Sequence, residues 1–72
     1  MWYELWDLRS GNIINTYDSE SEALTVVRDL ARLNGQDYVR TLSLTLEDDD
    51  ETTLVAKGTA LAQRIQELKD AV

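Results

Sequence analysis

TLSLTLEDDDETTLVA, residues 41–56, is the stretch that decides the fold class of this chain. Apolar and polar residues alternate strictly over its first six positions, and this period of two is typical of a strand that is buried on one face. The leucines are expected to face the core, at Leu42, Leu44 and Leu46. The hydroxyl residues are expected to face outward, at Thr41, Ser43 and Thr45.

Five consecutive acidic residues, 47–51, interrupt this pattern and predict the loop of a hairpin. With such a loop, Leu44 would lie opposite Leu54, and Leu42 opposite Ala56, in a pair that is apolar on one face. A divalent-cation site is a weaker interpretation, because the run lacks the spaced donors and the glycine of a calcium loop. Mimicry of nucleic-acid phosphates is also weaker, because it needs acidic residues spread over a face at regular separations and not one patch at a loop. We therefore expect a solvated loop whose charge discourages edge-to-edge aggregation.

The segment before this hairpin predicts an amphipathic helix. Ser19 is the expected N-cap, and Glu22 three residues later completes a capping box. Asn34-Gly35 supplies the C-terminal stop. The apolar positions fall at helical spacing, at Ala23, Leu24, Val27, Leu30 and Ala31.

The start of the chain predicts a first hairpin, with strands at 2–8 and 13–17 around the turn-forming Ser10, Gly11 and Asn12. A two-residue turn, either Gly11-Asn12 or Ser10-Gly11, would place one set of large residues on one face: Trp2, Trp6, Leu8, Ile13 and Tyr17. The other face would carry Tyr3, Leu5 and Ile14. An odd-length loop would exchange these partners. Both faces carry large apolar groups in either case, so we expect both to be covered.

The end of the chain, Thr59 to Val72, predicts a second helix after Gly58. Its narrow apolar seam has spacings of four, three and four, and consists of Leu61, Ile65, Leu68 and Val72, flanked by Ala62 and Ala71. The order β-β-α-β-β-α predicts a single α+β domain over residues 1–72, with a four-stranded antiparallel sheet and two helices. The first helix is expected on the leucine face. The last helix either covers the other face or packs on a partner subunit.

Composition excludes several classes of function. The 72 residues carry 14 acidic and 7 basic side chains, for a net charge of −7, with no Cys and no His. Disulfides, the usual zinc sites, imidazole bases and thiolate nucleophiles are therefore unavailable, and we expect no enzymatic activity, no catalytic residue, no cofactor and no metal. The acidity disfavours direct binding to nucleic acid or to an anionic membrane. Without an apolar run of roughly 20 residues or a signal-type start, a cytoplasmic location is expected.

The stretch YELWDLRSGNIINTYDSESEAL, residues 3–24, resembles a group of short uncharacterised acidic bacterial proteins. These begin with a strand, an SGN-type turn, a second strand and a helix that opens in D-S/T-x-x-EAL. The helix start is also similar to that of HicB-like antitoxin domains, whose family role is to bind and neutralise a small toxin. The resemblance implies a bacterial protein-binding domain, and no functional residue is carried over from it.

We expect a non-enzymatic cytoplasmic protein-binding module, antitoxin-like or a small regulatory adaptor, that acts as a homodimer because a core this small gains stability from oligomerisation. The alternative is a small acidic inhibitor or decoy that occupies a basic nucleic-acid-binding surface of a partner protein. Trp and Tyr are enriched at protein interfaces. The expected partner-binding residues are Trp2, Trp6, Tyr17, Leu61, Ile65, Leu68 and Val72.

Overall fold

The computed structural model describes residues 1–70, so Ala71 and Val72 of the expected seam lie outside the described residues. The elements follow the order β1 (Trp2–Asp7), β2 (Asn12–Tyr17), α1 (Glu20–Asn34), α2 (Gln36–Val39), β3 (Leu42–Asp48), β4 (Glu51–Lys57) and α3 (Thr59–Asp70). The four strands form one antiparallel sheet in the order β2-β1-β3-β4. The predicted α+β class is confirmed, and α2 is an additional short helix.

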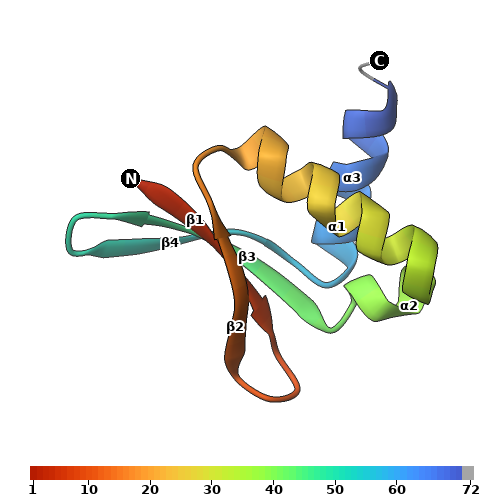
Figure 1. The fold of residues 1–72 in the computed structure, drawn as a ribbon, viewed down its shortest axis with the longest axis horizontal. Helices are drawn as coiled ribbons and strands as arrows, with labels where there is room; N and C mark the ends of the chain where they lie inside the picture. The colour runs from red at the N-terminus through yellow and green to blue at the C-terminus, as the bar shows by residue number, and fades with distance from the viewer. Residues whose placement is uncertain (71–72) are drawn as a thin grey trace.

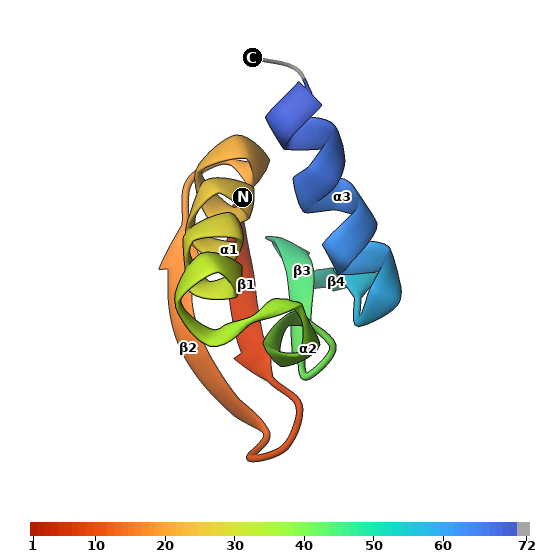
Figure 2. The same cartoon turned by 90° about the vertical axis from the view of Figure 1, so that its right-hand side faces the viewer.

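The helices lie together on one side of the sheet (Figures 1 and 2). The core forms between them and the sheet, and consists of Leu5, Tyr17, Ala23, Leu24, Val27, Ala31, Val39, Leu42, Leu44, Ala56, Leu61 and Ile65. The expectation that the last helix covers the other sheet face or packs on a partner is wrong, because α3 lies beside α1 on the leucine face. Gly58, at a φ of 56°, makes the turn from β4 into α3, and its N–H donates to the Leu42 carbonyl oxygen at 3.1 Å.

Both ends of α1 lie where the local sequence predicts them. The Ser19 hydroxyl accepts a hydrogen bond from the Glu22 N–H at 3.1 Å, as an N-cap does. Gly35 ends the helix at a φ of 92°, and its N–H donates to the Ala31 carbonyl oxygen at 2.8 Å. Both predicted boundaries are confirmed.

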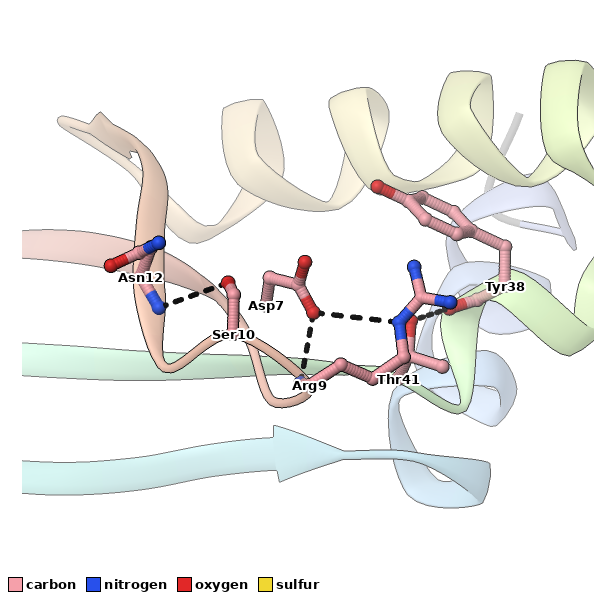
Figure 3. Close-up of polar contacts among 6 residues, drawn as sticks. All are labelled: Asp7, Arg9, Ser10, Asn12, Tyr38 and Thr41. Carbon is pink, nitrogen blue, oxygen red and sulfur yellow. Dashed lines mark hydrogen bonds and ion pairs between the residues drawn. The ribbon is translucent and has the colours of Figure 1, made fainter.

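The first hairpin differs from the prediction in its turn and in its register. Residues 8–11 form the connection, in which the Asp7 carboxylate accepts from the Arg9 N–H at 2.9 Å and the Ser10 hydroxyl accepts from the Asn12 N–H at 3.3 Å (Figure 3). The register shifts at Ile14, which is an extra residue of β2. Tyr17 therefore pairs with Tyr3 and faces the core, so its expected place beside the tryptophans is wrong.

The second hairpin has a shorter loop than predicted. Only Asp49 and Asp50 lie between the strands, so residues 47–51 are not all loop. Val55 is an extra residue of β4, and this bulge brings Leu44 opposite Ala56. The expected Leu44–Leu54 and Leu42–Ala56 pairs are therefore wrong.

One hydroxyl residue of β3 is not exposed as expected. Ser43 is 5% exposed, whereas the alternation placed it outward. Its cross-strand neighbours are Trp6 and Lys57, and both side chains are much larger than serine. Large neighbours on both sides account for its burial.

Candidate protein-contact surface on the sheet

The side of the sheet that faces away from the helices is named the open face here. Residues that pair directly across antiparallel strands point to the same side, so the register defines its members. They form a Trp2 row of Trp2, Glu47 and Thr52. A middle row contains Thr16, Glu4, Thr45 and Leu54. A Trp6 row contains Ile13, Trp6, Ser43 and Lys57.

The open face exposes large apolar side chains. Trp2 is 40% exposed, Ile13 45% and Leu54 51%, and Trp6 beside them is half-buried. Exposed apolar patches of this kind mark interaction surfaces in monomeric proteins, whereas single exposed residues are ordinary. Aromatic side chains also supply large contact areas at a small cost in conformational entropy.

A hydrogen-bond network holds the two tryptophans of the open face in place. The Trp2 indole N–H donates to the Glu4 carboxylate at 2.9 Å, and the Trp6 indole N–H donates to the Thr45 hydroxyl at 3.2 Å. The Glu47 carboxylate accepts from the Thr45 hydroxyl at 3.1 Å through Oε2. Its Oε1 accepts from the Thr52 hydroxyl at 2.6 Å. Rings and a carboxylate that are already fixed lose less side-chain entropy when a partner binds.

The two edges of the sheet are less suited to association than the open face. Both edge strands, β2 and β4, carry an extra residue, Ile14 and Val55 respectively. Bulges twist an edge and interrupt the regular row of donors and acceptors that another strand would pair with. The central strands of the open face, β1 and β3, have no such interruption. The open face is therefore the better contact surface.

The structure divides the expected contact residues between two places. Trp2 and Trp6 lie on the open face, whereas Leu61 and Ile65, at 0% and 2% exposed, lie in the core of their own chain. Leu68 is half-buried against the same core. Val72 lies outside the described residues.

Tyr17, the remaining expected contact residue, is 7% exposed on the core side. Burial raises the pKa of its phenol above the usual 10.0, and the charge of Glu22 raises it further. A buried neutral phenol serves the core and not a contact surface. Ile13 and Leu54 lie on the open face, where Tyr17 was expected. Neither of them was predicted as a contact residue.

The sequence contained a signal for Ile13 on the open face, because the expected hairpin already placed it beside the tryptophans. Leu54 had none, because its side depends on the loop length. The predicted five-residue loop placed Leu54 opposite Leu44 and toward the core, whereas the two-residue loop Asp49-Asp50 places it opposite Thr45 on the open face.

Two other kinds of site are absent from the described residues. Residues 1–70 contain no cluster of three or more acidic side chains arranged to hold a metal ion. None of the helices within this range combines the length and the apolar character needed to cross a membrane.

Comparison with protein-family models, with curated proteins and with solved structures finds no match to this chain.

Proposed function

We propose that this chain is a non-enzymatic cytoplasmic protein-binding module that acts as a homodimer, as a bacterial antitoxin or small regulatory adaptor does. The open face is the surface that joins the two copies. The observation that carries the proposal is the group of exposed apolar side chains on a sheet face that the chain's described helices leave uncovered: Trp2, Ile13 and Leu54.

A second copy fits the dimensions of this surface. Four strands about 4.8 Å apart, each six residues long or more at about 3.3 Å per residue, make a face of about 19 by 20 Å. Two such faces present about 760 Å² of flat area together, which is below the standard size of a stable interface and in the range of weak, transient association. We therefore expect a weak dimer, with a dissociation constant in the micromolar range or above. Association also covers apolar surface that a small domain cannot bury alone.

The test is sedimentation equilibrium of the purified chain at micromolar concentrations. The wild-type mass should rise with concentration toward twice the chain mass of 8.2 kDa. Leu54→Gln, on the open face, should be monomeric and folded, because Leu54 is 51% exposed in the single chain. Leu33→Gln is the matched control, since Leu33 is 82% exposed on α1, on the helical side.

The control should remain dimeric. A wild-type monomer at high concentration would rule out the homodimer. A dimer that tolerates Leu54→Gln but is lost in Leu33→Gln would move the interface to the helices.

A further inference from the structure

The charges on the open face are distributed unevenly along the strands, and this distribution selects one arrangement of the proposed dimer. Glu47 lies in the Trp2 row, next to the acidic tip, which we define as residues 48–51. Lys57 lies in the Trp6 row at the other end of β4. Glu4 occupies the middle row. The inference rests on the homodimer proposed above.

We consider the aligned mode of sheet packing, in which two packed sheets keep their strand directions within about 30° of each other. A two-fold axis between them lies in the plane of the interface, and therefore runs either along the strands or across them. An axis along the strands brings the acidic tips of both copies to the same end, where the sheet spacing of about 10 Å and a lateral offset of two strand spacings, also about 10 Å, separate them by about 14 Å. This is less than two Debye lengths of about 8 Å at physiological salt, so salt screens the repulsion between the tips only in part.

An axis across the strands has the opposite effect. The two acidic tips then lie at opposite ends of the sandwich, separated by a strand length of about 20 Å, and salt screens their repulsion. Figure 1 shows this tip, the turn between β3 and β4, projecting well away from the helices. For a chain with a net charge of −7, this arrangement is electrostatically preferred.

The same axis reverses the order of the rows between the two copies. The Trp2 row of one copy faces the Trp6 row of the other, so that Trp2 meets Trp6 and Glu47 comes beside Lys57. Aromatic pairing and an ion pair therefore occur twice in the interface. Glu4 faces its own counterpart near the axis, but its carboxylate is drawn toward the Trp2 row by the indole N–H at 2.9 Å.

We propose that the two copies pack through their open faces with a two-fold axis across the strands, and that Lys57 of each copy pairs with Glu47 of the other. Lys57 is then the residue that selects this partner orientation. With an axis along the strands, Lys57 of one copy would instead lie opposite Ile13 of the other copy, which is in the same row but on the other edge strand.

The experiment reverses each charge and then mixes the variants. Lys57→Glu alone and Glu47→Lys alone each place two like-charged pairs in the homodimer, and each should weaken it by about tenfold or more. Their equimolar mixture should form a heterodimer of near wild-type affinity, because both pairs again join opposite charges, one with its wild-type polarity and one with the polarity reversed. Arg32→Glu, on the exposed end of α1, is the control for the change in net charge.

Glu47→Lys also removes acceptors from two threonines, so the comparison of Lys57→Glu with Arg32→Glu is decisive by itself if Glu47→Lys does not fold. A wild-type dimer that Lys57→Glu weakens no more than Arg32→Glu would overturn the orientation and leave the homodimer standing. A wild-type monomer would remove both proposals.

Discussion

At the scale of the residue, Tyr17 shows how one side chain changes role with the face it occupies. A tyrosine next to two tryptophans would be a contact residue, whereas Tyr17 lies opposite Tyr3 and is buried in the core. Its raised pKa follows from that burial first and from Glu22 second. The phenol therefore stays protonated in the folded chain at a pH where it ionises in the unfolded chain.

This difference predicts a loss of stability in alkali. Below the unfolded pKa of about 10, Tyr17 is neutral in both states and contributes no pH dependence. As the pH rises past that value toward the folded pKa, the unfolded state releases its proton first, and the free energy of unfolding falls. Urea titrations over this range should show a steeper fall for the wild type than for Tyr17→Phe. If the free energy of unfolding fell equally steeply with pH in the two proteins, the Tyr17 hydroxyl would be exposed to water.

At the scale of the element, the sequence predicts what depends on local chemistry and misses what depends on register. Ser19 and Gly35 bound α1 as expected, because capping and a positive φ involve only neighbouring residues. Leu42 and Leu44 face the core as expected, because the alternation in β3 is uninterrupted. The helix α2 has four residues, which is too short for any periodicity to predict.

The bulges and the length of one loop account for most of the remaining errors. Ile14 and Val55 are ordinary strand residues, so neither composition nor pattern indicates that one of them is an extra residue. Each bulge moves the residues beyond it to the opposite side of the sheet. Tyr17 lies on the other side from the prediction for this reason, whereas Leu54 does so because the loop has two residues and not five. The open face could therefore be predicted from the sequence only in part, through Trp2, Trp6 and Ile13.

The second hairpin carries a local conflict that a single substitution should relieve. Asp48 and Glu51 pair directly across β3 and β4, and like charges in that position are destabilising. Glu51→Lys replaces the repulsion with an attraction and should raise the free energy of unfolding by about 0.2 to 1 kcal/mol. Glu51→Gln should give an intermediate value in the same urea titration. If added salt does not reduce the gain, its origin is not electrostatic.

At the scale of the whole molecule, the fold is a two-layer slab whose Cα extents are 33 × 29 × 17 Å. All of the buried apolar residues lie between the sheet and the helices, so the described chain has a core on one side only. The open face carries Trp2 and Leu54 in contact with water. A second sheet on that face would convert the slab into a symmetric four-layer structure with the helices outside.

Thermal unfolding should reveal this coupling between folding and assembly. If two copies dissociate as they unfold, mass action makes the melting temperature depend on protein concentration. For a chain of this size, each tenfold increase in concentration should raise the melting temperature by about 3 to 6 °C. Leu54→Gln should melt at a temperature that does not change with concentration, while Leu33→Gln should follow the wild type. A wild-type melting temperature that stays constant over this range would mean that the core between the helices and the leucine face is stable by itself, with the open face left to water.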